Sequence, residues 1–123
     1  LADLKDGGEE FLCAQLIDLH PKVRHWVRNL ASAPAGFALP TSRGWFYADF
    51  VAELTDDRVA LLEYKGAHLA NDPGEIEKRQ SGELWARQSD GKAVFGWLML
   101  TQGGKSLAQQ LDEVLVLAWT CAC

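Results

Sequence analysis

Two apolar segments of the sequence carry charged residues at positions where a buried strand would exclude them. Asp49 lies within WFYADFVAEL (45–54), and Glu63 and Lys65 lie near the end of RVALLEYKG (58–66). Because successive side chains of a strand point to opposite faces, Glu63 and Lys65 share one face. The intervening TDD is a turn signal, and a hairpin folded there places Asp49 beside Glu63. The sequence therefore predicts two carboxylates and an ammonium group on one patch.

Such a patch is suited to binding a metal ion. Carboxylates on neighbouring strands, with Cβ atoms roughly 5 Å apart, repel each other unless a proton or a cation lies between them. Oxygen ligands from Asp49 and Glu63, with the backbone carbonyl of Tyr64, suit a hard divalent ion, so we expect Mg²⁺, with Mn²⁺ as a substitute. Lys65 would orient or deprotonate an attacking water, or stabilise negative charge in the transition state. The alternative is an ordinary ion pair between Lys65 and either acid.

The same residues resemble a known motif. FYADF followed by LLEYKGAHL resembles the PD-(D/E)xK nuclease superfamily, with Asp49, Glu63 and Lys65 matching the Asp, the second acid and the lysine of that motif. Ala48 stands where the motif has proline. Five blocks in order are similar to the carboxy-terminal endonuclease domain of the restriction subunit of type III restriction enzymes and related DEAD-like helicase proteins: EEFLCAQLID, WVRNL, FYADF, EYKGAHL and EKRQSGELW.

This resemblance implies a fold, an activity and partners. The fold would be restriction-endonuclease-like, with a central mixed sheet flanked by helices. The activity would be Mg²⁺-dependent hydrolysis of phosphodiester bonds in double-stranded DNA, as part of restriction-modification. A covalently linked ATPase or helicase domain and a methyltransferase or specificity subunit would lie outside these 123 residues. The alternative is a catalytically inactive module of the same fold, used for assembly or for docking DNA within a helicase.

The resemblance also adds residues outside the motif. An acid from the first helix would join the catalytic and metal-binding set. We prefer Glu10 and keep Glu9 in reserve, because consecutive helical residues differ by about 100° and only one can face the site. Favourable charge at a helix start would explain both acids without any chemistry. The candidate DNA contacts, each with a structural alternative, are Arg28, Asn29, His68 and Lys78.

The remaining pattern predicts the elements that position these residues. Apolar residues at helical spacing predict helices over about 9–19 and 21–30, within 71–91, and over 106–119 with Ser106 as its cap. Apolar and β-branched runs predict strands over 45–54, 58–66 and 92–100, and residues 31–44 read as a loop with one strand. The last two strands should be parallel, since a helix connects them. The result is an α/β fold with a mixed sheet.

Composition limits the remaining possibilities. The 123 residues suffice for one domain, and the start at Leu1 leads us to expect a piece of a longer polypeptide. A formal charge of −5 is unfavourable for DNA binding, so local basic residues or cations would have to supply the affinity. Cys13, Cys121 and Cys123 have no disulfide-scaffold spacing, which favours free thiols and the cytoplasm. With no apolar run of about 18 residues, no membrane span is expected.

Overall fold

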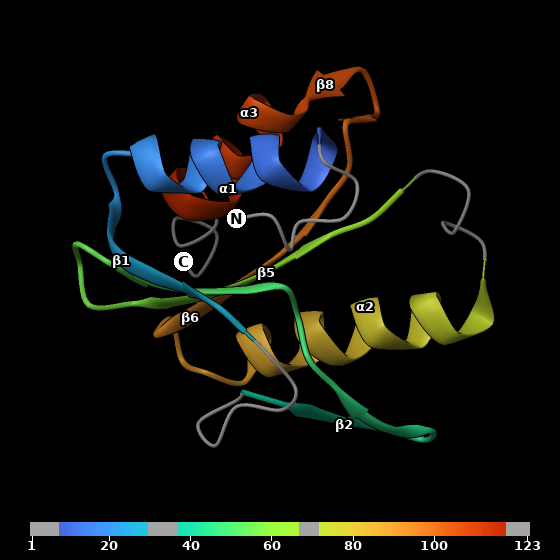
Figure 1. Ribbon diagram of the computed structural model, residues 1–123. Helices are drawn as coiled ribbons and strands as arrows, with labels where there is room; N and C mark the ends of the chain where they lie inside the picture. Colours follow the sequence, from blue (N-terminus) through green and yellow to red (C-terminus); the bar gives the residue numbers. More distant parts are fainter. Residues whose placement is uncertain (1–7, 30–36, 67–71, 118–123) are drawn as a thin grey trace.

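A central sheet between helices organises the protein (Figure 1). The computed structural model describes residues 8–29, 37–66 and 72–117. The main sheet has the strand order β1-β4-β5-β6, with strands β1 (Val23–Arg28), β4 (Phe50–Leu54), β5 (Val59–Tyr64) and β6 (Ala93–Leu98). Strand β4 is antiparallel to both β1 and β5, whereas β5 and β6 are parallel. The predicted mixed sheet and its parallel pair are confirmed.

The hairpin of β4 and β5 has the register predicted from the sequence. Phe50 lies opposite Leu62, and Val51 lies opposite Leu61. Extending this register by one residue places Asp49 opposite Glu63. The hairpin therefore brings the two acids to the end of the β4–β5 ladder, where regular pairing stops.

The prediction of a helix over residues 21–30 is wrong, because Val23–Arg28 form strand β1 along β4. A bulge between Val23 and His25 shifts the alternation of the β1 side chains between the two faces of the sheet by one residue. Val23 and Trp26 are three residues apart, yet both pack against the same core. In a regular strand such residues would point to opposite faces. The bulge thus gives a strand the apolar spacing that is typical of a helix.

Two small hairpins accompany the main sheet. Strand β2 (Leu39–Thr41) is the one strand expected in the loop over 31–44, and it pairs with β3 (Gly44–Phe46). The prediction of one strand over 45–54 is wrong, because residues 45–46 belong to β3, residues 47–49 lie in no strand, and only Phe50–Leu54 join the main sheet. Strands β7 (Thr101–Gln102) and β8 (Lys105–Ser106) pair across a turn in which both central glycines have positive φ. Only glycine adopts such angles readily, so this sequence can turn within two residues.

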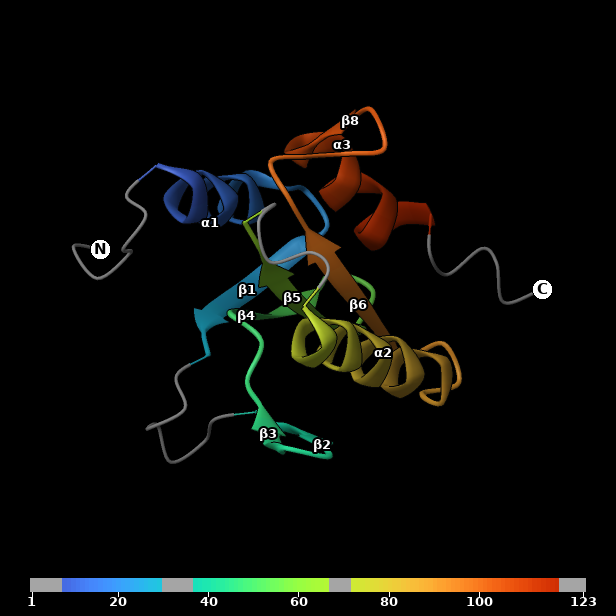
Figure 2. The same cartoon turned by 90° about the vertical axis from the view of Figure 1, so that its right-hand side faces the viewer.

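Helices cover both faces of the main sheet, as Figures 1 and 2 show. Helix α1 (Glu9–Leu19) and helix α3 (Leu107–Asp112), which continues as the π-helical turn η2 (Glu113–Leu117), lie on one face. Helix α2 (Pro73–Arg87) and the β2–β3 hairpin lie on the other. Helix α1 has its predicted bounds, and Ser106 caps α3 through the predicted side-chain bond, which accepts from the backbone N–H of Gln109.

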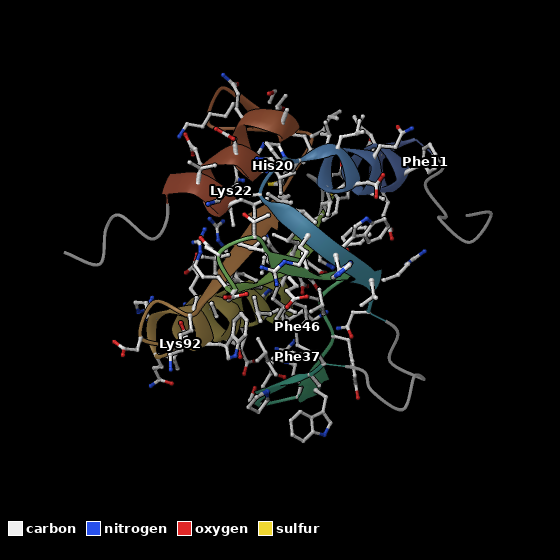
Figure 3. The ribbon with its side chains drawn as sticks, turned by 90° about the vertical axis from the view of Figure 1, so that its left-hand side faces the viewer. Phe11, His20, Lys22, Phe37, Phe46 and Lys92 are labelled. Carbon is white, nitrogen blue, oxygen red and sulfur yellow. The ribbon has the colours of Figure 1, made fainter. Side chains whose placement is uncertain are left out.

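Each face of the sheet has its own buried core. On the α1 and α3 side the buried residues are Cys13, Ala14, Ile17, Phe50, Ala52, Leu54, Ala60, Leu62, Tyr64, Val94, Leu98, Leu107, Leu111 and Leu115. On the α2 side they are Leu39, Phe46, Ala48, Leu61 and Trp97, with Phe37 packed against them; Figure 3 labels Phe37 and Phe46 there. Alternation along β5 sends Leu62 and Tyr64 to the first core, and Leu61 and Glu63 to the second side.

No described helix is both long and apolar enough to cross a membrane.

Candidate active site

Asp49 and Glu63, called the acid pair below, meet where strands β4 and β5 separate. The backbone N–H of Asp49 donates to Glu63 Oε1 at 2.9 Å. The backbone N–H of Tyr64 donates to Asp49 Oδ2, also at 2.9 Å. Side chains thus take over hydrogen bonds that a longer strand ladder would have made, and the two predicted acids are held in contact.

Lys65 lies between carboxylates from two different elements. Its Nζ is 2.9 Å from Glu63 Oε2 on β5 and 2.7 Å from Glu75 Oε1 on α2. Its backbone N–H donates to the carbonyl of Leu98 in β6 at 2.8 Å, and its ammonium lies 6.0 Å from the ring centroid of Trp97. The predicted position of Lys65 beside Glu63 is confirmed, and Glu75 is an addition that the sequence did not reveal.

The acid pair is costly to ionise. Burial, and next the charge of Asp49, raise the pKa of Glu63 to about 8, although Lys65 acts in the opposite direction. Burial also raises the pKa of Asp49, against the hydrogen bond from Tyr64 and the positive charges of Lys65 and Arg28. At neutral pH Glu63 is therefore largely protonated. A cation in the same place would allow both acids to ionise.

The positive charge of Lys65 persists at neutral pH. Burial lowers the pKa of Lys65, but the carboxylates of Glu63 and Glu75 outweigh it and raise that pKa to about 12. Burial likewise opposes ionisation of Glu75, and hydrogen bonds from Lys65 and Lys78 reverse this and lower its pKa. Glu75 is therefore the stable counterion of Lys65 whether or not Glu63 holds a proton.

Helix α1 brings a further acid toward the site. Glu10 Oε2 is 2.8 Å from the Arg28 guanidinium, and only 15% of the Glu10 side chain is exposed. The neighbouring Glu9 instead accepts a hydrogen bond from the Tyr64 hydroxyl. Burial raises the pKa of Cys13 to about 12, with further contributions from the charges of Asp49, Glu10 and Glu63 in that order. Glu9 is thus engaged by Tyr64, and Glu10 stays the preferred acid from α1.

The four predicted DNA contacts have different surroundings. The Asn29 amide is used internally, since Nδ2 donates to the carbonyls of Phe37 and Ala48 and Oδ1 accepts from the Phe37 N–H. These bonds favour the structural alternative for Asn29, in which its amide braces the neighbouring segments. Arg28 pairs with Glu10, and Lys78 donates to Glu75 Oε2 at 3.0 Å. His68 lies outside the described residues.

The predicted ligand set can be tested against a metal ion. Within residues 8–29, 37–66 and 72–117, no group of three or more His, Cys, Asp or Glu side chains is arranged to hold one. The acid pair nevertheless fits Mg²⁺, which usually takes one or two carboxylates and keeps several waters. The fit rests on two adjacent carboxyl groups, of which buried Glu63 carries a proton at neutral pH that a divalent ion can replace. Nothing in the structure marks the Tyr64 carbonyl as a ligand.

Sequence reasoning missed one member of this site. Glu75 lies in the first turn of α2, and its residue is only 9% exposed. The start of α1, the end of β5 and the start of α2 lie on one side of the molecule in Figure 1. A carboxylate in the first helical turn usually reads as favourable helix-end charge. The only available signal was Lys78, three residues later, which forms a helical pair with Glu75.

Comparison with models of protein families, with curated proteins and with solved structures found no match to this chain.

Proposed function

We propose that this chain is a Mg²⁺-dependent endonuclease domain that hydrolyses phosphodiester bonds of double-stranded DNA. The single observation that carries the proposal is the convergence of Asp49, Glu63 and Lys65 at the end of the β4–β5 hairpin. The α/β fold with its mixed sheet is compatible with a restriction-endonuclease-like arrangement, which forms part of the proposal. The proposal also includes a location in the cytoplasm, a linked ATPase or helicase domain, and a methyltransferase subunit of a type III restriction-like complex.

The residues of the site would divide the work. Asp49 and Glu63 would hold the ion, with Glu10 approaching from α1. When bound, Mg²⁺ supplies positive charge beside the scissile phosphate. Lys65, kept protonated by its two carboxylates, would donate hydrogen bonds to a phosphate oxygen or to the attacking water. Negative charge that develops on the phosphate would then be stabilised by the ion and Lys65, which are already in position, so the site would need little reorganisation.

Cleavage of a supercoiled plasmid in Mg²⁺ tests this proposal. The full-length protein that contains this chain should be compared with its Asp49→Ala and Lys65→Ala variants. We expect each variant to cut roughly 100-fold or more slowly, because each loses one charged group at the reacting centre. Glu53→Ala removes an exposed carboxylate from β4 and serves as the control that keeps its activity. Equal cutting by all four proteins would refute the proposal.

A second candidate is a nuclease-fold module that docks DNA or assembles a helicase without cutting. The observation that favours it is the contact of Lys65 Nζ with Glu63 Oε2, because that ion pair engages an oxygen a metal ion would need. Titration with Mn²⁺, followed by electron paramagnetic resonance, separates the two functions. A saturable site that disappears in Asp49→Asn supports the enzyme. A docking module has no need of such a site.

A further inference from the structure

Glu75 has an environment that its place in the helix does not require. Glutamate is rarely buried unless it is paired, yet Glu75 is only 9% exposed. Favourable charge at the start of α2 would be obtained equally by a side chain in solvent. Instead the carboxylate turns toward the sheet, where Oε1 is 2.7 Å from Lys65 and Oε2 is 3.0 Å from Lys78.

Lys65 is restrained by three elements at once. Strand β6 fixes its backbone through the bond to Leu98, β5 supplies the Glu63 carboxylate, and α2 supplies Glu75. The lysine side chain is only 16% exposed, so its ammonium has little access to other partners. Of the two carboxylates, Glu63 is also a proposed metal ligand. Glu75 belongs to another element, and its carboxylate forms ion pairs with Lys65 and Lys78.

A metal ion and Lys65 would compete for the carboxylate of Glu63. If Glu63 were the only counterion, binding of the ion would leave the ammonium unpaired in a mostly buried place, which is costly. Glu75 offers a second counterion: Lys65 Nζ is 2.7 Å from Glu75 Oε1 and 2.9 Å from Glu63 Oε2. Lys65 can therefore stay beside the site while Glu63 turns to the ion.

We propose that Glu75 is the positioning residue for Lys65 in DNA cleavage: it holds the ammonium beside the acid pair when Glu63 binds the metal ion. This inference rests on the proposed nuclease function. Lys78 assists by bonding the other oxygen of Glu75, which fixes the carboxylate plane, while its own ammonium lies 5.8 Å from the ring centroid of Phe46.

Steady-state cleavage by Glu75→Gln tests the positioning role. Glu83→Gln is the matched control, because it makes the same change on the same helix at a residue whose side chain is 45% exposed and pairs with Arg79. We expect Glu75→Gln to lower kcat roughly 10- to 100-fold, the effect of misplacing a reacting group by about 1 Å. KM for DNA should change by less than about twofold, because Glu75 would not contact the substrate. The Glu83→Gln variant should cut at the wild-type rate.

A second measurement needs no cleavage. The measurement is made with Mg²⁺ present, so that Glu63 is engaged by the ion. The side-chain ¹⁵Nζ resonance of Lys65, assigned with Lys65→Arg, should then be protected from solvent exchange in the wild-type chain and in Glu83→Gln, and should lose that protection in Glu75→Gln. Glu75→Asp keeps the charge on a shorter side chain, so it should give intermediate kcat and protection; it also serves if Glu75→Gln does not fold.

The outcomes are distinguishable. A wild-type protein that cuts DNA, with Glu75→Gln cutting equally well, overturns the positioning role and leaves the proposed function intact. A wild-type protein that cuts no DNA overturns the proposed function, and the nuclear magnetic resonance comparison then decides whether Glu75 holds Lys65. Unchanged protection of the Lys65 ammonium in Glu75→Gln overturns the inference in either case.

Discussion

Replacement of Glu63 by glutamine should change how the stability of the metal-free protein depends on pH. Glu63 is 4% exposed, and its pKa rises from 4.5 to about 8 because of burial and then of Asp49. A carboxyl group with a raised pKa in the folded state favours folding while it is protonated. The contribution of Glu63 to the free energy of unfolding is complete below pH 4.5 and is lost as the pH rises toward about 8. Glutamine has no such titration.

The size of the effect follows from linkage. A difference of one pKa unit between the folded and unfolded states corresponds to about 1.36 kcal/mol. The rise at Glu63 therefore corresponds to a loss of roughly 3 kcal/mol by pH 7 and roughly 5 kcal/mol above pH 8. The attraction between Lys65 and ionised Glu63 is already contained in that pKa. Glutamine otherwise changes packing and neutral hydrogen bonds, which shifts the variant by an amount that varies little with pH. The slope of the difference curve, and not its offset, isolates Glu63.

Urea unfolding in EDTA between pH 5 and pH 8.5 measures this curve. We expect the free energy of unfolding of Glu63→Gln, minus that of the wild type, to increase with pH by about 3 kcal/mol or more. Glu53→Gln, whose side chain is 49% exposed on β4, should give a flat difference. A difference that decreases with pH would refute the reasoning, because Lys65 would then hold Glu63 ionised below its ordinary pKa.

Three further changes test the packing around the site. A Cβ at Gly82 would overlap the Phe95 ring, so Gly82→Ala should lower the free energy of unfolding by about 1–3 kcal/mol, whereas exposed Gln80→Ala on the same helix should be near neutral in urea unfolding. Asn29→Ala loses three hydrogen bonds to neighbouring loops, so it should lower the free energy of unfolding by about 3 kcal/mol. The affinity of the folded protein for DNA, measured by fluorescence anisotropy, should stay unchanged. Cys13 is 1% exposed with a pKa of about 12, so site-resolved mass spectrometry should find it unmodified by iodoacetamide at pH 8 until the protein unfolds; modification in the native state would contradict this burial.

The sequence predicts the hairpin that carries the acid pair because local signals there agree. Two apolar, β-rich runs flank a short polar turn, and the turn fixes which residues lie opposite each other. Residues 21–30 lack that agreement. The bulge between Val23 and His25 gives β1 the apolar spacing of a helix, and only the hydrogen bonds to β4 decide the conformation. Pairing with a strand more than twenty residues away leaves no mark in a local window.

The contact of Glu75 with Lys65 is beyond local sequence reasoning for a different reason. It depends on where the start of α2 returns to the sheet after β5, and that return is set by packing. Gly82, which has room for no side chain beside Phe95, fixes how closely α2 approaches β6. Sequence spacing shows that Glu75 and Lys78 share a helical face, but it does not show which face turns inward.

The energetic cost of the acid pair separates the two candidate functions. An asparagine at 49 and a glutamine at 63 could accept the same two backbone N–H bonds without a charge to bury. A docking module would gain stability from that exchange and lose nothing. Two acids held in contact, with Glu63 buried, destabilise the fold unless a cation lies between them. Such a loss of stability is typical of sites whose charge is used in chemistry. The Asp49→Asn and Glu63→Gln variants should therefore be more stable than the wild type without metal at pH 8, and only the wild type should be stabilised further by Mn²⁺.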